Sequence, residues 1–361
     1  MPHFPKISKL PDFDPTRHRH WVSILKKDKK ADKHNSLRVL SFNVLNQSYM
    51  WPQVYNSYVA KEYRSWDYRL SLLQNTVTNP QFQSGIMCFQ EMESKSFKQI
   101  WKPMFRQLGY DGEFIRKGTP GYWHDSKDAE LIDGVSVFYD KSQFELIECE
   151  KFKIADYFND TFENDYGMAM DRTAIGEILN SKNQVELIMV LRHLSTDKII
   201  VVSNTHLYWK LSDIKLLQLI VILQALNRVQ KRYPNSKVLF MGDFNSSPQS
   251  SVYKFLKNDK IETCHPDIAP FLVHPDKEFI ENPVRSQSNV FDSIIAENDL
   301  FTCFTQHLFG IFDYIWFNSR DFRLTGFLSG VDTSYMKSIS GLPNRDYPSD
   351  HIPLVAEFEI L

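Results

Sequence analysis

The sequence predicts an α/β fold in which β-sheets pack face to face and helices lie outside them. Several short apolar runs have the pattern of strands buried on both faces, as expected for strands between layers. Helical segments alternate with these strands, and no stretch between them has the composition of a linker. We therefore expect one domain over residues 37–361, preceded by a flexible arm over residues 1–36.

The predicted strands are rich in β-branched and aromatic residues and are bounded by residues that favour turns. In chain order they cover residues 37–43, 85–90, 134–139, 185–192, 198–205, 237–242, 312–317 and 353–360. The last one begins with Pro353, which the first position of a strand tolerates.

Helices are predicted between these strands. Ser212 and Asp213 can cap a helix that runs to about Tyr233, and Pro234 follows it directly. Two further helices are expected over residues 68–77 and 97–108, and loops rich in Gly, Pro and Asp over residues 116–133, 156–172, 264–290 and 329–349.

The charge balance limits how the protein can hold a ligand. Its 42 basic and 44 acidic residues give a net charge of −2, and 42% of the residues are hydrophobic, enough for a substantial core. A protein that binds nucleic acid through charge alone is usually strongly basic. A polyanionic ligand would therefore need local positive charge or a bound metal ion.

Cysteine usage and hydropathy bear on the compartment. Cys88, Cys149, Cys264 and Cys303 form no C-x-x-C pair and match no zinc spacing, so free thiols in a reducing compartment are expected. No apolar run reaches the roughly 18 residues that span a bilayer, and no membrane association is expected. We expect a cytoplasmic or nuclear protein. The basic stretch of the arm leaves mitochondrial import open, but it supports import only weakly because acidic residues interrupt it.

Polar residues of catalytic type stand at the ends of most predicted buried strands, where protein scaffolds commonly place active sites. They are Asn43, Gln90, Glu91, Asn204, His206, Asp243, Asn245, Asp313, Asp350 and His351. Each alone has a plainer explanation: Asn43 as a turn residue, Glu91 as a helix cap, Asp350 with His351 as a loop ion pair. So many polar strand ends in one chain are hard to explain as independent turns.

These residue types suit one chemistry. Carboxylates without clustered thiols or histidines favour Mg²⁺, or Mn²⁺, over zinc. Mg²⁺ needs only one or two carboxylates together with substrate phosphate oxygens, and asparagine and histidine can donate hydrogen bonds to phosphate. These residue types therefore favour a magnesium site that binds the phosphate oxygens of a ligand.

The order of the motifs resembles the endonuclease/exonuclease/phosphatase superfamily, the DNase I-like enzymes. Its pattern of N, QE, GD-x-N and SDH is met in order by Asn43, Gln90-Glu91, residues 242–245 and residues 349–351. The stretches NTHLYWKLSDIKLLQ (204–218), GDFNSSPQSSVYKFL (242–256) and GIFDYIWF (310–317) resemble its deadenylase–nocturnin branch. Within that branch, SYMWPQVY (48–55) and GLPNRDYPSDHIPL (341–354) are similar to the fungal NGL-type RNA exonucleases.

The resemblance implies a four-layer αββα sandwich and metal-dependent hydrolysis of a phosphodiester by water. It implies that the metal site comprises Glu91 as principal ligand together with Asn43, Asp243 and Asp350. The implied catalytic residues are Asp243, which orients and deprotonates the water or binds a second metal, His351, its partner Asp313, and His206. The implied substrate contacts are Asn245, Asn204 and His206. Asp133 also matches a motif position, and a structural role is expected for it first.

Some positions depart from the pattern of poly(A)-specific deadenylases. Lys210-Leu211 replaces an Asp-Pro pair, Cys303 replaces an asparagine, and Leu308 stands where an aromatic base-stacking residue is typical. Losing a stacking ring removes about 1–3 kcal/mol per base, so these departures argue against poly(A) selectivity.

The expected function is therefore a Mg²⁺-dependent RNase, most simply a 3′-5′ exoribonuclease of deadenylase/nocturnin type. One alternative is a phosphatase or phosphodiesterase that acts on a nucleotide-sized molecule, such as a dinucleotide 2′-phosphate, a 2′-5′ linkage or a cyclic phosphate end. Another is a catalytically idle binding module, against which the intact set of acids and histidines argues. No docking repeats are seen, and the pattern carries no signal for the oligomeric state.

Overall fold

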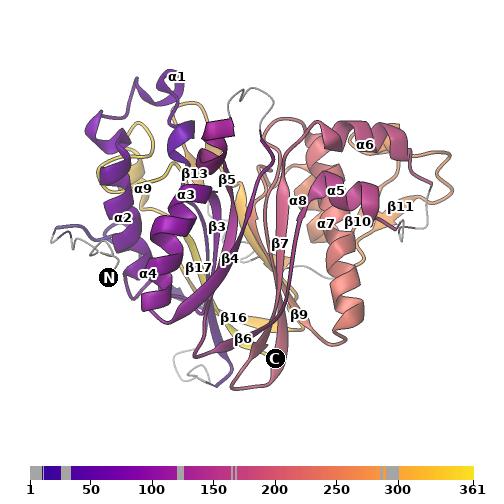
Figure 1. Ribbon diagram of the computed structural model, residues 1–361, viewed down its shortest axis with the longest axis horizontal. Helices are drawn as coiled ribbons and strands as arrows, with labels where there is room; N and C mark the ends of the chain where they lie inside the picture. The colour runs from indigo at the N-terminus through magenta and orange to yellow at the C-terminus, as the bar shows by residue number, and fades with distance from the viewer. Residues whose placement is uncertain are drawn as a thin grey trace.

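The computed structural model consists of two β-sheets packed face to face, with helices on both outer sides (Figure 1). Helices α2 and α4 lie outside one sheet, and helices α5 to α8 lie outside the other. The predicted four-layer αββα sandwich is confirmed. The structure describes residues 10, 12–25, 34–119, 126–163, 166, 169–284, 288–289 and 301–361.

The first sheet contains the N-terminal and C-terminal strands of the described chain. Its neighbouring strands are antiparallel apart from β2 and β3, which are parallel. Its order is β1 (Trp21–Ser23), β16 (Phe322–Leu328), β17 (Leu354–Ile360), β2 (Ser36–Asn43), β3 (Ile86–Glu93), β5 (Asp133–Asp140) and β4 (Tyr110–Arg116).

The second sheet is also mixed, with β8 and β9 as its parallel pair. Its order is β12 (Ser288–Asn289), β15 (Asp313–Phe317), β9 (Lys237–Asp243), β8 (Lys198–His206), β7 (Val185–His193) and β6 (Phe144–Lys153). Two small antiparallel ribbons join β10 (Lys260–Glu262) to β11 (Phe279–Glu281) and β13 (Cys303–Phe304) to β14 (Phe309–Gly310).

The helices are mostly short, apart from α2 and α7. The α-helices are α1 (Pro52–Tyr55), α2 (Trp66–Thr78), α3 (Ser94–Ser96), α4 (Lys102–Gln107), α5 (Ile154–Asp160), α6 (Arg172–Asn180), α7 (Ser212–Arg232), α8 (Ser251–Asn258) and α9 (Thr333–Met336). A π-helical turn covers Phe97–Trp101, and 3₁₀ turns cover Gln47–Tyr49, Glu62–Arg64, Ser126–Leu131 and Ala269–Phe271. In the part of the chain that the structure describes, no helix is long and apolar enough to span a membrane.

Every predicted strand and helix is present, although the helix expected over 97–108 begins as the π-helical turn and continues as α4. The sequence reading missed several elements, the longest of which are β4, β6, β16, α5, α6 and α8; α5 lies partly in the loop expected over residues 156–172. Strands β4 and β6 lie at the edges of the two sheets, and β6 carries half-exposed glutamates such as Glu148 and Glu150. An edge strand with charged residues lacks the apolar run that identified the central strands.

The predicted flexible arm over residues 1–36 is wrong for its described middle part. Residues Trp21–Ser23 form β1 and pair with β16. The buried guanidinium of Arg19 donates to the carbonyls of Ser329 and Pro353, at 2.7 Å each. These carbonyls lie in loops of the main domain, so Arg19 fastens the segment to it. The rest of the arm, residues 1–9, 11 and 26–33, lies outside the described residues.

The sheet topology brings the ends of several strands to one edge of the sandwich. The parallel strands β2 and β3 end there in one sheet, and β8 and β9 end there in the other. The antiparallel strand β15 begins at the same edge, beside the end of β9. A continuous apolar core fills the space between the sheets, where Phe317 of β15 contacts Phe358 of β17. This packing fixes the strand ends relative to one another.

Candidate active site

The strand ends place polar side chains from both sheets next to one another. Asn43 is the last residue of β2, His206 the last of β8 and Asp243 the last of β9. In the second sheet, Asp243 is the register partner of His206 on one side and of Asp313 on the other. The side chains that the sequence placed at separate strand ends therefore gather at a single location.

Unusual backbone conformations turn two of these ends toward the site. Glu91 has a φ of 57° and lies in a bulge of β3, where the register shifts between Phe89 and Met92. A bulge re-aims a side chain that a regular strand would point elsewhere. Gly242 has a φ of 146°, and a Cβ there would stand 2.2 Å from the carbonyl oxygen of Thr205. Only glycine allows β8 and β9 to approach this closely before Asp243.

Asn43 links carboxylates from the two sheets. Its Nδ2 donates to Glu91 Oε1 and to Asp243 Oδ2, at 3.0 Å each. Its Oδ1 accepts from the backbone N–H of Leu45 at 3.0 Å, and the N–H of Asn46 donates to Glu91 Oε2 at 2.9 Å. Asn43 was predicted among the metal ligands, but its amide nitrogen faces the carboxylates. Its position is that of a residue that orients Glu91 and Asp243.

His351 and Asp313 form a buried pair. The Nδ1 of His351 lies 2.7 Å from Asp313 Oδ2, and its Nε2 lies 3.7 Å from Asp243 Oδ2. Burial alone would lower the pKa of His351, but Asp313, Cys303 and Asp243 together raise it well above its ordinary value. The ring is therefore an imidazolium at neutral pH, with Nδ1–H donated to Asp313 and Nε2–H directed toward the site.

His206 approaches the same carboxylate as His351, but its ring is neutral rather than cationic. Burial, and then the positive charges of Lys117 and His351, lower the pKa of His206 well below its ordinary value. Lys117 Nζ lies 3.2 Å from His206 Nδ1 and 2.8 Å from Asp133 Oδ2. Because Lys117 donates to Nδ1, the neutral ring carries its hydrogen on Nε2, which lies 3.6 Å from Asp243 Oδ2.

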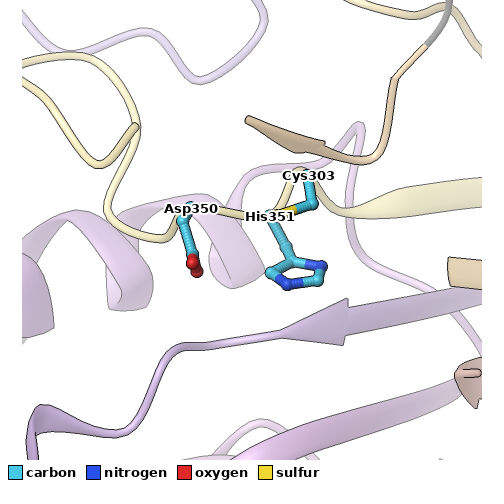
Figure 2. A group of neighbouring side chains, drawn as sticks. All are labelled: Cys303, Asp350 and His351. Carbon is cyan, nitrogen blue, oxygen red and sulfur yellow. The ribbon is translucent and has the colours of Figure 1, made fainter. Parts of the chain in front are cut away.

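The loop before β17 carries Asp350 next to His351, and Figure 2 shows the two side chains with Cys303. The hydroxyl of Tyr55 donates to Asp350 Oδ2 at 2.8 Å. The buried Arg69 of α2 donates to the carbonyl of Pro348 at 2.6 Å and to that of Val44 at 2.8 Å. One guanidinium thus holds both the loop that follows Asn43 and the loop that carries His351.

The carboxylates of the site are close together and undercompensated by positive charge. Burial, and then Asp133 and Asp350, raise the pKa of Glu91. Burial, and then Asp313, raise the pKa of Asp243. A divalent cation would relieve both effects, and the available donors are mostly carboxylate oxygens, which hard cations prefer. The residues present therefore fit a divalent cation held by Glu91 with Asp350 or Asp243.

Asn204 was predicted to bind substrate, and the structure contradicts this. It is fully buried between the sheets, where its Nδ2 donates to the carbonyls of Phe89 at 3.1 Å and Ser136 at 2.9 Å. Its Oδ1 accepts from Gln90 Nε2 at 2.7 Å. Both amide hydrogens are used, so none remains for a phosphate. Asn204 instead links the two sheets below the site.

Among the described residues, the side-chain amide of Asn245 uses one of its two hydrogens, which leaves the other for a ligand. Its Nδ2 donates to the carbonyl of Leu207 at 2.9 Å, and its backbone N–H donates to Asp243 Oδ1 at 2.9 Å. Lys215 of α7 donates to the carbonyl of Asn245 at 2.6 Å. Partial burial of the Lys215 ammonium lowers the pKa of Lys215.

Sequence reasoning assigned no role to several residues around the site, although Tyr55 and Lys215 lie in the stretches SYMWPQVY and NTHLYWKLSDIKLLQ. These residues are Tyr55, Arg69, Lys117 and Lys215. Arg69 and Lys215 lie within helices that were predicted only as helices, and Lys117 lies in an expected loop. The one available signal for Arg69 and Lys215 was a charged residue at a helix position where an apolar one is expected. That signal does not show which residue the charge would contact.

Comparison with known proteins agrees with this geometry. The endonuclease/exonuclease/phosphatase family model matches residues 40–351. The RNA exonuclease NGL1 of Saccharomyces cerevisiae is 35% identical over 359 residues, which cover 92% of this chain and 95% of that protein. The CCR4-Not complex 3′-5′-exoribonuclease subunit Ccr4 of Candida glabrata is 30% identical over 375 residues, which cover 100% of this chain but 41% of Ccr4.

The fold is also that of a solved relative. The crystal structure of ANGEL2, a 2′,3′-cyclic phosphatase, in complex with adenosine-2′,3′-vanadate superimposes with a TM-score of 0.74 and 21% identity, covering 95% of this chain and 98% of that one. At this identity the similarity concerns the fold. The family match and the identity across nearly the whole of NGL1 show that this chain belongs to the endonuclease/exonuclease/phosphatase family of hydrolases, on the branch of deadenylases and NGL-type RNA exonucleases.

Proposed function

We propose that this protein is a Mg²⁺-dependent 3′-5′ exoribonuclease. The observation that carries the proposal is the approach of two imidazoles to one carboxylate. The Nε2 atoms of His206 and His351 lie 3.6 Å and 3.7 Å from Asp243 Oδ2, and both are directed into the site. Two N–H donors beside a base are suited to bind a phosphate and to promote the attack of water on it.

The residues of the chain have separate tasks in this reaction. Asp243 accepts the proton of the attacking water, because burial raises its pKa and makes it a stronger base than an exposed aspartate. His351, held as an imidazolium by Asp313, stabilises the charge that develops on the phosphate oxygens. Neutral His206 and the free amide hydrogen of Asn245 orient the phosphate.

The proposed cofactor is Mg²⁺, with Mn²⁺ as a substitute. When bound, it would supply the positive charge that polarises the phosphate and lowers the pKa of a coordinated water. Glu91 and Asp350 would hold it, and Asn43 keeps Glu91 oriented. This local charge explains how a chain with a net charge of −2 can act on a polyanion.

RNA as substrate is supported by the relatives. NGL1 is named an RNA exonuclease and Ccr4 a 3′-5′-exoribonuclease, and NGL1 matches this chain over almost its full length. A nucleotide-sized phosphate ester remains the second candidate. The near-neutral net charge and the exposed aliphatic residues Leu211 and Leu308 favour it, because an extended strand is bound by positive charge and by aromatic rings that stack on its bases.

The test uses 5′-labelled RNA of mixed sequence, poly(A) and single-stranded DNA, each incubated with Mg²⁺ and purified protein. A ladder of progressively shorter RNA is expected, with protection by a 3′-phosphate. Asp243→Asn should lower the rate by about 10²-fold or more. The matched control is Asp321→Asn, because Asp321 pairs with Lys237 at the opposite end of β9, 3.3 Å away. Equal rates for all three proteins would overturn the proposal.

A second set of substrates separates the two candidate functions. RNA ending in a 2′,3′-cyclic phosphate and the dinucleotide NADP are incubated under the same conditions. Release or opening of the terminal phosphate without shortening of the RNA would favour the nucleotide-sized substrate and reject the exonuclease.

A further inference from the structure

A buried thiol lies against the two residues that end the SDH motif. Cys303 of β13 is 1% exposed and forms an isolated β-bridge with His351. The backbone N–H of Phe304 donates to the carbonyl of Asp350 at 2.9 Å, and that of Ile352 donates to the carbonyl of Thr302 at 2.8 Å. These bonds fix the position of the thiol relative to Asp350 and His351.

The three side chains converge. The Cys303 sulfur, one ring nitrogen of His351 and one carboxylate oxygen of Asp350 all lie within 4.8 Å of one another (Figure 2). Across the described residues, no other cysteine belongs to such a group of three potential metal ligands. The neighbouring group of Asp243, Asp313 and His351 contains no sulfur.

This donor set differs in kind from the one proposed for Mg²⁺. Thiolate, imidazole and carboxylate together are typical ligands of zinc, whereas Mg²⁺ avoids sulfur. Zinc bonds of about 2.0–2.3 Å place the ligand atoms of a tetrahedral site roughly 3.5 Å apart. The present separations therefore need to close by about 1 Å, which small side-chain rotations can provide.

We propose that Zn²⁺ binds to Cys303, Asp350 and His351 and thereby inhibits the enzyme. The zinc bonds form as the Cys303 thiol and the ligating ring nitrogen of the His351 imidazolium each lose one proton to solvent, and no oxidation or reduction takes place. His351 then donates an electron pair to the metal and no longer donates a hydrogen bond to phosphate. The site stands without the proposed function, whereas the inhibition rests on it.

The surroundings leave one carboxylate oxygen available to such a metal. Tyr55 donates to Asp350 Oδ2 at 2.8 Å, whereas among the described residues Oδ1 is contacted only by the Ser349 hydroxyl, at 3.4 Å. Burial raises the pKa of Cys303, so zinc must displace a tightly held proton.

Binding is tested with Co²⁺ as a spectroscopic substitute for zinc. Full-length protein should develop a near-ultraviolet thiolate-to-cobalt absorption band that added Zn²⁺ abolishes. Cys303→Ser should lack the band. Cys264→Ser is the matched control and should keep it, because Cys264 is exposed and lies outside the cluster. If Cys303→Ser does not fold, Cys303→Ala is used instead, with thermal unfolding as the check.

Inhibition is tested with RNA hydrolysis at saturating Mg²⁺. The Zn²⁺ concentration that halves the rate should rise by about tenfold or more in Cys303→Ser, compared with the wild type and Cys264→Ser. Absence of the thiolate band in the wild type would overturn the site, and equal zinc sensitivity of all three proteins would overturn the inhibition. A thiolate band in a protein that hydrolyses no RNA would support the site and count against only the proposed function.

Discussion

Asp313→Asn tests the proposed state of His351 most directly. The substitution keeps the shape of the side chain and one hydrogen-bond acceptor, but removes the negative charge 2.7 Å from the imidazole. If the carboxylate holds His351 as an imidazolium, the variant should lose both rate at neutral pH and activity at alkaline pH. If Asp313 only fills space, neither should change.

The magnitude follows from the geometry. Two unit charges 2.7 Å apart attract by about 6 kcal/mol at an effective dielectric constant of about 20. The hydrogen bond that asparagine retains and the contribution of Asp243 offset part of this, so we expect a net loss of about 3 kcal/mol. Losing this stabilisation of the cationic ring lowers the pKa of His351, and the same loss in the transition state reduces the rate about 100-fold.

Asp313→Asn should also change how activity depends on pH. The pKa of His351 is raised in the folded wild type, so the imidazolium is lost only as pH rises through that raised pKa. In Asp313→Asn that pKa falls, and the alkaline decline of kcat/KM should move to lower pH. The same charge pair stabilises the folded state, fully at pH values below about 6.5, so the variant should also unfold more easily there.

The assay measures kcat/KM on labelled RNA across the pH range, with Asp321→Asn, in the turn between β15 and β16, as the control for removing an aspartate elsewhere. Asp321 pairs with Lys237 far from the site, and its substitution should leave the profile in place. An alkaline decline at the same pH in Asp313→Asn and the wild type would refute the assignment of His351 as an imidazolium.

Three further predictions concern the frame of the site. Burial raises the pKa of Glu186 well above its ordinary value. The contribution of Glu186 to the free energy of unfolding is therefore most favourable below about pH 4 and becomes less favourable as pH rises toward the folded pKa. Glu186→Gln should remove this pH dependence, measured by urea unfolding. Arg19→Ala should cost about 2–4 kcal/mol, measured the same way, because two buried carbonyls lose their donor. Asn204→Leu should lower the melting temperature before it affects KM, whereas an unchanged melting temperature with a raised KM would restore Asn204 as a substrate contact.

The strands that could be predicted are those whose burial produces a run of apolar residues in the sequence. Strands β8 and β9 are central, parallel and buried on both faces, so each appears in the sequence as an apolar run. Strand β6 lies at an edge and exposes every second residue, which makes it look like a polar segment. Strand β1 depends on Arg19 finding carbonyls more than 300 residues away, and no local pattern encodes that distance.

The same distinction applies to the site. The sequence predicted that Glu91, Asp243 and His351 meet, and the structure brings them together through Asn43 and Asp313. It misplaced Asn204, because an amide that joins two sheets and an amide that binds phosphate look alike at a strand end. Lys117 contacts His206 and Asp133, which lie on strands β8 and β5. Its role can therefore be recognised only once the structure places these three residues together.

The departures from the deadenylase pattern also acquire a physical meaning in the structure. Leu211 is 55% exposed and Leu308 is 45% exposed, so both side chains are open to solvent, and neither provides a flat ring on which a base could stack. The groups proposed for hydrolysis lie deeper and depend on hydrogen bonds between the two sheets. Changes at these exposed positions therefore leave the hydrolytic geometry intact while weakening the preference for a particular base. An enzyme built this way would recognise the phosphate backbone more than the nucleobase, and its selectivity would depend on the 3′ end of the strand.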